Sequence, residues 1–358
     1  MSTNADKLDS WQVHDESFRE IFGSSPSLDL LLQVDSYAFA HEAGVFIPST
    51  DDLFITSNQI VDKDGARKVQ VSKISLPTGG KTVKHEEISC PEIAMGNGGV
   101  NYGDDILFCA QGSMTRPSGL FKMSRTPPYA IEPVITSFHS RPFNSVNDVV
   151  VSKDGSIWFT DPPYGHEQGY RPPATLPSQV YRFDPATSSI RAMADGFGRP
   201  NGICFSPDER TVYVTDTDLV HGDGTVDGNR ASTIYAFDVE QRHGQPVLLN
   251  RRLFAFADVG IPDGIKCDTN GNVYSGCGDG VNVWSPGGVL LGRILVDGGA
   301  ANFCFGRGGE LFILNEHRLW RAQLRSGPVL WCNLLWLHGV THWISSGNML
   351  FLCYPGKA

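Results

Sequence analysis

The sequence contains no cluster of basic residues and no long apolar segment. Its 29 Lys and Arg residues are outnumbered by 39 Asp and Glu residues, which gives a formal net charge of −10. Because nucleic-acid binding depends on Lys and Arg contacts to phosphates, a nucleic-acid partner is not expected. The longest apolar run, residues 329–340, is interrupted by Asn333 and His338 and is too short to cross a bilayer. The first 25 residues lack the basic and apolar stretches of a signal peptide, so we expect a cytoplasmic protein with no membrane partner.

Cysteine motifs and helical periodicity are also missing. The eight cysteines are scattered and form no CxxC pair, so we expect buried reduced thiols rather than a disulfide framework or a thiolate metal site. No long stretch has the 3.6-residue period of an amphipathic helix. By contrast, 39 Gly and 22 Pro indicate many turns, as an all-β protein requires.

A repeated pattern runs along the chain. Each copy has a polar opening residue, a short apolar strand, a turn rich in Asp, Asn or Gly, and a second apolar strand. The copies open, about 52 residues apart, at Glu42, at Asn97 or Asn101, at Asn147, at Asn201, at Asp263 and at Asn302. Six units of about four short strands each predict an all-β fold, a six-bladed β-propeller, in preference to a pair of β-sandwiches.

The repeat also sets the expected domain boundaries. Residues 1–27 are predicted to be a flexible or weakly helical leader, and residues 28–358 a single propeller domain. Residues 28–39 fit either a strand or a short helix. The outer strands of the last unit are expected at residues 329–337 and 349–354.

In a propeller, equivalent positions of all blades meet at the central axis. Glu42, Asn147, Asn201 and Asp263 together offer two carboxylates and two amide oxygens at that point. These hard oxygen donors suit Ca²⁺, Mg²⁺ or Mn²⁺ better than a metal that prefers soft ligands. An Asn before Gly or Asp often only forms a turn, but four such residues in one repeat position favour a metal site in the central channel.

At these residues the sequence resembles the senescence marker protein/gluconolactonase family of six-bladed propellers. This lactonohydrolase group belongs to the calcium-dependent phosphotriesterase-like superfamily. The most specific segments are FAHEAGVFIPSTDDLFITSN, SVNDVVVSKDGSIWFTDPPYG, RPNGICFSPDERTVYVTDT and IPDGIKCDTNGNVYSGC. The words HEA and NGGVNYGDD are most similar to the fungal-type lactonohydrolases.

The resemblance implies a metal-dependent hydrolase that opens a lactone or a similar ester. It implies that Glu42, Asn201 and Asp263 are metal ligands, and that Asn147 is either a ligand or a substrate contact. Ca²⁺ is the expected ion, with Mg²⁺, Mn²⁺ and Zn²⁺ as alternatives. The metal would polarise the carbonyl and activate water.

We predict that Asp263 takes or positions the proton of the attacking water and that Asn147 assists in catalysis. Asp148 is the alternative to Asp263 as proton acceptor. Five further residues are expected to contact substrate at the channel mouth, although turn or structural roles also fit them: His41, Asn97, Asn101, Tyr164 and Asn302.

Two other functions remain open at the sequence level. The same pocket could belong to a non-hydrolytic cyclase or synthase of a secondary-metabolite pathway, because related propellers such as strictosidine synthase condense substrates by proximity. A non-catalytic calcium- or ligand-binding propeller is the third interpretation, since fold alone does not define function. All three predict a small-molecule partner and leave the oligomeric state open.

Overall fold

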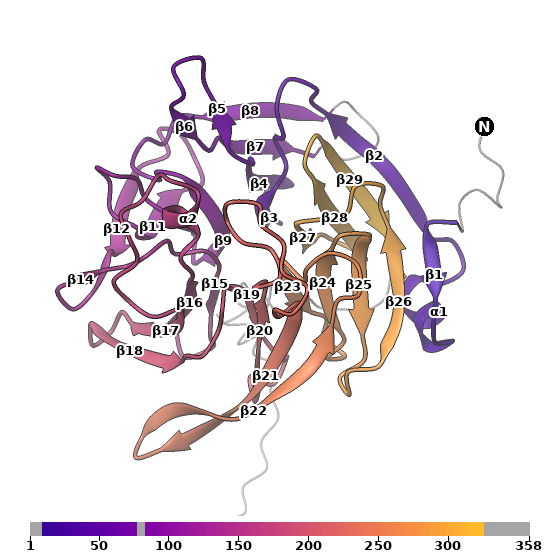
Figure 1. Cartoon of the computed structure of the whole chain (residues 1–358). Helices are drawn as coiled ribbons and strands as arrows, with labels where there is room; N and C mark the ends of the chain where they lie inside the picture. The colour runs from indigo at the N-terminus through magenta and orange to yellow at the C-terminus, as the bar shows by residue number, and fades with distance from the viewer. Residues whose placement is uncertain (1–8, 77–82, 326–358) are drawn as a thin grey trace, which may run out of the picture.

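The chain folds into six antiparallel sheets arranged as the blades of a ring (Figure 1). The computed structural model describes residues 9–76 and 83–325. The predicted all-β fold with six propeller blades is confirmed. Neither of the two short helices in the described part of the chain is long and apolar enough to cross a membrane.

The blades follow one another along the chain, each beginning with its innermost strand. Blade 1 contains β3 (Glu42–Ile47), β4 (Asp52–Thr56), β7 (Val71–Ser75) and β8 (Lys84–Ile88), and blade 2 contains β9 (Gly96–Tyr102), β10 (Asp105–Ala110), β11 (Gly119–Ser124) and β12 (Ile131–Ile135). Blade 3 contains β15 (Val149–Val151), β16 (Ile157–Asp161), β17 (Gln179–Asp184) and β18 (Ser189–Ala194), and blade 4 contains β19 (Pro200–Phe205), β20 (Thr211–Asp216), β21 (Thr233–Arg242) and β22 (Gln245–Phe256). Blade 5 contains β23 (Ile265–Cys267), β24 (Val273–Cys277), β25 (Gly280–Trp284) and β26 (Leu290–Leu295), and blade 6 contains β27 (Asn302–Phe305), β28 (Glu310–Asn315) and β29 (Arg318–Gln323). Two small ribbons pair β5 (Ile60–Val61) with β6 (Arg67–Lys68) and β13 (Ser137–Phe138) with β14 (Arg141–Pro142).

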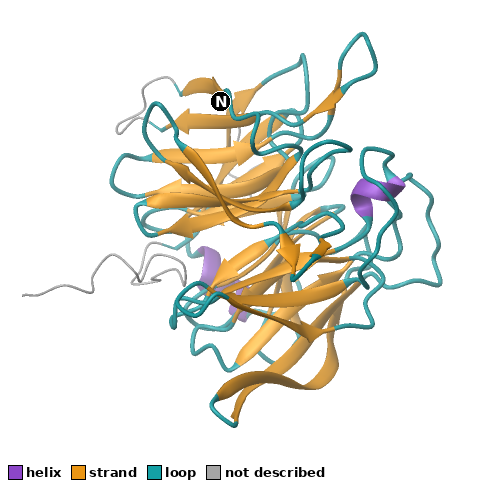
Figure 2. Ribbon diagram, turned by 90° about the vertical axis from the view of Figure 1, so that its left-hand side faces the viewer, coloured by secondary structure: helices purple, strands orange, loops and turns teal. Residues whose placement is uncertain are grey.

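The six innermost strands form a closed ring around the axis. Each of β3, β9, β15, β19, β23 and β27 contacts the next, and β27 contacts β3 again. Figure 1 looks along this axis and shows the six strands around the centre. In the side view of Figure 2, loops lie at both faces of the ring and the short helix α2 (Tyr164–Glu167) stands on one of them.

The hydrophobic core consists of layers between neighbouring blades. Six clusters of buried side chains each join two consecutive blades around the ring. Between blades 1 and 2, for example, Phe54 and Phe108 are both fully buried. Between blades 6 and 1, the rings of Phe46 and Phe312 lie 5.7 Å apart. Blade-to-blade packing therefore fixes the positions of the innermost strands.

The N-terminal segment corrects the predicted leader. Within residues 9–27, β1 (Trp11–Val13) pairs with β26 as a fifth strand of blade 5. The helix α1 (Ser17–Phe22) follows and buries Phe18 completely. These residues are packed on the propeller rather than flexible, because their aromatic side chains cover apolar surface of blades 5 and 6.

The strand β2 (Ser27–Gln33) completes blade 6 by pairing with β29. The ambiguous segment beginning at Leu28 is therefore a strand. The outer strands expected at residues 329–337 and 349–354 lie outside the described residues, and the place beside β29 is occupied by β2.

Candidate functional site

The six opening residues all lie at the N-terminal ends of the innermost strands. Glu42 and Asn302 begin β3 and β27, Asn97 and Asn201 are the second residues of β9 and β19, and Asn147 and Asp263 precede β15 and β23 by two residues. The ring of strand contacts brings these ends together at one end of the channel. We call this group the opening residues.

Threonine hydroxyls position several opening residues from the preceding blade. In three blades, a Thr on the second strand donates a hydrogen bond from Oγ1 to the backbone carbonyl of the next blade's opening residue. These bonds are Thr56 to Asn97 (3.0 Å), Thr160 to Asn201 (2.6 Å) and Thr215 to Asp263 (3.0 Å). Each of these three opening residues is therefore held by two blades.

The glycines that follow three opening residues permit close approach between innermost strands. A Cβ added at Gly202 would lie 2.5 Å from the carbonyl oxygen of Asp263, and one at Gly264 would lie 2.4 Å from the side chain of Asn302. At Gly98, it would lie 2.5 Å from the Asp148 carboxylate. No side chain fits at such distances, so the Asn-Gly and Asp-Gly pairs serve strand packing here rather than turn formation.

Two carboxylates at the ends of second strands, those of Asp161 and Asp216, hydrogen-bond to the loops that precede Asn147 and Asn201. Asp161 accepts hydrogen bonds from the backbone N–H groups of Asn144 and Ser145, and Asp216 accepts the same pair of bonds from the loop at 198–199. Both carboxylates lie at the end of a second strand. Asp161 in blade 3 and Asp216 in blade 4 thus have the same structural role.

Four opening residues carry buried oxygens without a hydrogen-bond partner among the described residues. These atoms are Oδ1 of Asn97, Asn147, Asn201 and Asp263. Buried polar atoms in folded proteins are almost always hydrogen-bonded, and an unmatched group calls for an explanation such as an ion. Four unmatched oxygens from four consecutive blades fit a cation with hard oxygen ligands.

Glu42 supplies a second carboxylate and is oriented by Asn302. The amide nitrogen of Asn302 donates a hydrogen bond to Glu42 Oε2 at 2.7 Å, and its Oδ1 accepts one from the N–H of Phe303 at 2.8 Å. Asn302 is fully buried. Its side chain is thus engaged within the protein, and the geometry assigns it to holding Glu42 rather than to the predicted contact with substrate.

The carboxyl groups of Glu42 and Asp263 lie close enough to repel each other when both are ionised. Burial raises the pKa of Glu42, and the charge of Asp148 adds to the effect. Burial followed by the charge of Glu42 raises the pKa of Asp263 well above its usual range. A divalent cation between them would stabilise both ionised forms. The described residues contain no group of three or more His, Cys, Asp or Glu that could hold a metal, so the donor set depends on the amide oxygens.

His41 is held beside these ligands by a residue that the sequence did not reveal. Its Nδ1 lies 2.6 Å from Oε1 of Glu316, whose Oε2 accepts a hydrogen bond from Asn58 at 3.1 Å. Burial lowers the pKa of His41, but the adjacent Glu316 carboxylate more than offsets this and the pKa rises to about 9. The charges of Glu42 and Asp263 act on the same ring, which places His41 next to the opening residues.

Tyr164 lies close to the opening residues, on a loop that is tied down at both sides. Its hydroxyl hydrogen-bonds to Thr217, and the side chain of Asn201 lies beside it. Beside it, Glu167 of the same short helix pairs with Arg199 at 2.6 Å and accepts a hydrogen bond from the N–H of Gly222 at 2.8 Å. These contacts hold the loop in one position at the predicted mouth of the channel.

Two other predicted residues have different surroundings. Asn101 lies four residues after Asn97, about 13 Å further along an extended strand, and its side chain donates to the carbonyl of Phe46. It lines a pocket at the other end of the channel instead of joining the opening residues. Asp148 accepts backbone N–H bonds from Val149 and Ile203 at 2.9 and 3.0 Å, so it joins two blades.

Comparisons with known proteins agree with this geometry. The family model described as "SMP-30/Gluconolactonase/LRE-like region" matches residues 80–317. The lactonohydrolase oryL of Aspergillus oryzae is 29% identical over 80% of this chain and 67% of its own length. A gluconolactonase of Zymomonas mobilis is 31% identical over 54% of each chain.

A solved structure shares the fold over nearly its whole length. A gluconolactonase from Xanthomonas campestris has a TM-score of 0.68 and 28% identity to this chain, and the match covers 88% of this chain and 94% of that one. The named sequence relatives and this structure are all lactonases. The chain therefore belongs to the SMP-30/gluconolactonase family, and we class it with the lactonases.

Proposed function

We propose that this protein hydrolyses a small lactone with the help of a divalent cation held by the opening residues. One observation carries the proposal: four buried oxygens without a partner, from Asn97, Asn147, Asn201 and Asp263, accompany the Glu42 carboxylate at one end of the channel. Lactonase relatives supply the reaction class. The donor set supports Ca²⁺ as the ion.

Glu42, Asn147, Asn201 and Asp263 would hold this cation. When bound, it would polarise the lactone carbonyl and make a bound water more acidic. Water adds to the carbonyl carbon, the ring C–O bond breaks, and a hydroxy acid is released. Asp263 positions the attacking water and receives its proton, which then passes to the departing ring oxygen.

Other residues position the substrate around this centre. Tyr164 places a hydroxyl beside Asn201, and its braced loop limits the size of the substrate. His41 is kept in one orientation by Glu316 and faces Glu42 and Asp263. Both side chains can donate hydrogen bonds to ring or hydroxyl oxygens of a lactone. We therefore infer that these two residues contribute to substrate choice.

Metal removal tests the proposal directly. Purified protein is treated with a chelator, and hydrolysis of aldonolactones, aromatic lactones and organophosphate esters is followed by acid release. We expect at least one lactone to be hydrolysed, activity to be lost on chelation, and Ca²⁺ or another divalent ion to restore it. Incorporation of ¹⁸O from labelled water into the product separates hydrolysis from cyclisation. An unchanged rate after verified metal removal would contradict the mechanism.

Substitution of Asp263 tests its assigned role. Asp263→Asn keeps the shape of the side chain but removes the charge, so we expect kcat/KM to fall by about 10²- to 10⁴-fold. Metal content of the same samples shows how much of the loss reflects weaker binding of the cation. Glu240→Gln, on the exposed side of β21, is the matched control and should keep full activity. Wild-type activity in Asp263→Asn would exclude this residue from the reaction.

A further inference from the structure

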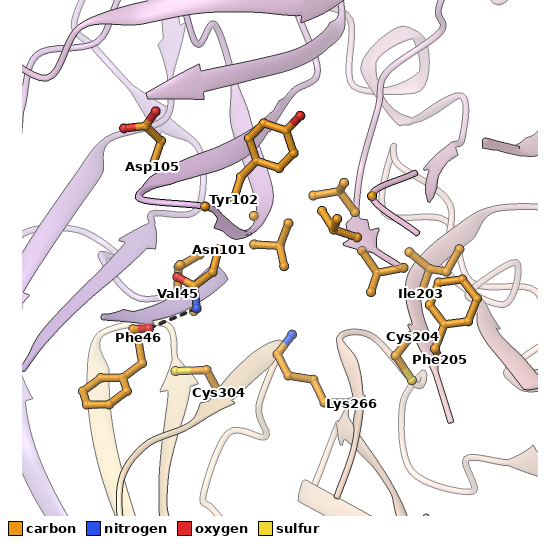
Figure 3. Close-up of a pocket in the computed structure, with 18 of the residues that line it drawn as sticks. Val45, Phe46, Asn101, Tyr102, Asp105, Ile203, Cys204, Phe205, Lys266 and Cys304 are labelled. Carbon is orange, nitrogen blue, oxygen red and sulfur yellow. Dashed lines mark hydrogen bonds between the residues drawn. The ribbon is translucent and has the colours of Figure 1, made fainter. Parts of the chain in front are cut away.

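A pocket occupies the opposite end of the channel from the opening residues. Its volume is about 610 Å³, and the C-terminal parts of all six innermost strands contribute to its lining (Figure 3). None of the opening residues lines it. The volume falls in the range of small-molecule sites, which is about 300–1,000 Å³.

The wall of this pocket is mostly apolar. Val45, Val150, Ile203, Ile265 and Phe305 come from five different blades and surround the space. A ligand that fills the pocket would therefore need an apolar body, because burial of such surface on both partners favours binding.

One positive charge projects into this apolar space. In Figure 3 the ammonium of Lys266 points towards the centre of the pocket. In the described part of the chain, the lysines that form ion pairs are Lys73 and Lys122, so Lys266 forms none, and its ammonium lies 6.0 Å from the centroid of the Phe303 ring. The charge of Lys266 also lowers the pKa of Asp148 and that of Glu42, which places it on the side of the pocket nearest the buried acids.

The other cations of the pocket are already paired. Lys122 lies 2.5 Å from Glu132 and 3.7 Å from Asp105, and Arg125 lies 3.0 Å from Asp104. These pairs stand at the rim, where side chains are more exposed. Among the described residues, Lys266 is thus the cation of this pocket that forms no ion pair.

We propose that this pocket binds an aliphatic monocarboxylate, with its carboxylate on the ammonium of Lys266 and its alkyl chain along the apolar wall. A charge-assisted hydrogen bond is stronger beside apolar walls, which lower the local dielectric, than in bulk water. Acidic residues of the lining, including Asp154, Asp184 and Glu209, repel each negative charge of a ligand, so a ligand with one carboxylate is favoured over one with several. The site is separate from the proposed cation site and does not depend on the lactonase activity.

Calorimetric titration with octanoate tests this site in the full-length protein loaded with Ca²⁺. We expect one octanoate to bind per chain and octan-1-ol, which lacks the charge, to bind at least about 10-fold more weakly. Lys266→Met should weaken octanoate binding by a similar factor, whereas Lys266→Arg should retain it. No binding of octanoate, or equal affinity for the alcohol, would overturn the proposal.

Two matched variants locate the bound octanoate. Lys122→Met removes a paired cation at the rim and should leave octanoate affinity unchanged. Asp263→Asn alters the proposed cation site and should also bind octanoate normally, which separates this proposal from the lactonase mechanism. Octanoate affinity lost in Asp263→Asn but retained in Lys266→Met would place the ligand at the other end of the channel and contradict the proposal.

A crystal structure with 8-bromooctanoate provides a test that needs no variant. The bromine anomalous signal should lie between the apolar walls near Phe305, with the carboxylate at Lys266. A signal at the opening residues, or no signal at a concentration that saturates binding, would refute the assignment even if Lys266→Met failed to fold.

Discussion

At Asn302, one buried amide controls the position of a carboxylate on another blade. Its nitrogen lies 2.7 Å from Glu42 Oε2, and its own oxygen is held by the backbone of Phe303. Partners of this kind commonly fix the direction of a metal-binding side chain and raise affinity for the metal. Asn302 is thus a positioning residue for the proposed cation.

Replacement of Asn302 should weaken the cation site while leaving its ligands in place. Asn302→Ala removes the hydrogen bond to Glu42, so we expect Ca²⁺ affinity to fall by about 10- to 100-fold. Calorimetric titration of chelator-treated protein with Ca²⁺ measures the change, and Asn250→Ala, on the surface of β22, is the control. Unchanged Ca²⁺ affinity would show that Glu42 does not depend on this bond.

At the scale of the strand, the glycines after the opening residues set the spacing of the ring. Gly202 on β19 lies so close to the backbone of Asp263 that no Cβ fits between them. Similar contacts at Gly98 and Gly264 join β9 to the start of blade 3, and the start of blade 5 to β27. The diameter of the channel at the opening residues therefore depends on glycines, because they have no Cβ.

A single added methyl group should test this spacing. Gly202→Ala would force β19 away from the segment that carries Asp263, so we expect the free energy of unfolding to fall by about 1–3 kcal/mol. Gly228 has open space around its Cα and lies in a surface loop, so Gly228→Ala should be nearly neutral. Urea unfolding of both variants measures the difference, and equal stability would contradict the packing argument.

The sequence predicted the innermost strands better than the contacts around them. The opening residues could be located because the strand-turn-strand pattern recurs at a regular spacing, and the blade order follows from that spacing. Glu316 could not be found in this way, because it meets His41 from 275 residues away. Asn101 was misplaced for a related reason: two asparagines fitted the opening position of blade 2, and strand register alone separates them.

At the scale of the whole molecule, the ring is closed by its first long strand and its last described one. β2 pairs with β29 along residues 27–33, so blade 6 combines both ends of the described chain. β1 adds a further strand to blade 5. Within the segment expected to be a leader, residues 1–27, β1 thus contributes to blade 5, and β2 begins at its last residue, Ser27.

Removal of this segment should destabilise the protein in two steps. Deletion of residues 1–15 removes β1, and we expect a modest fall in Tm. Deletion of residues 1–33 also removes α1 with its buried Phe18, and β2, which leaves the edge of β29 unpaired, so we expect Tm to fall by about 10 °C or more. Circular dichroism measures both, and a synthetic peptide of residues 24–36 should partly restore the longer deletion. Equal Tm values for the two deletions would argue against a closing role for β2.

Closure by β2 has a consequence for synthesis on the ribosome. The strand β2 ends at residue 33 and emerges long before its partner β29, which ends at residue 323. At about 5–20 residues per second, β2 would wait roughly 15–60 s for its partner. During that time its edge can pair with another nascent chain, so slow translation or crowded polysomes would favour aggregation of incomplete chains.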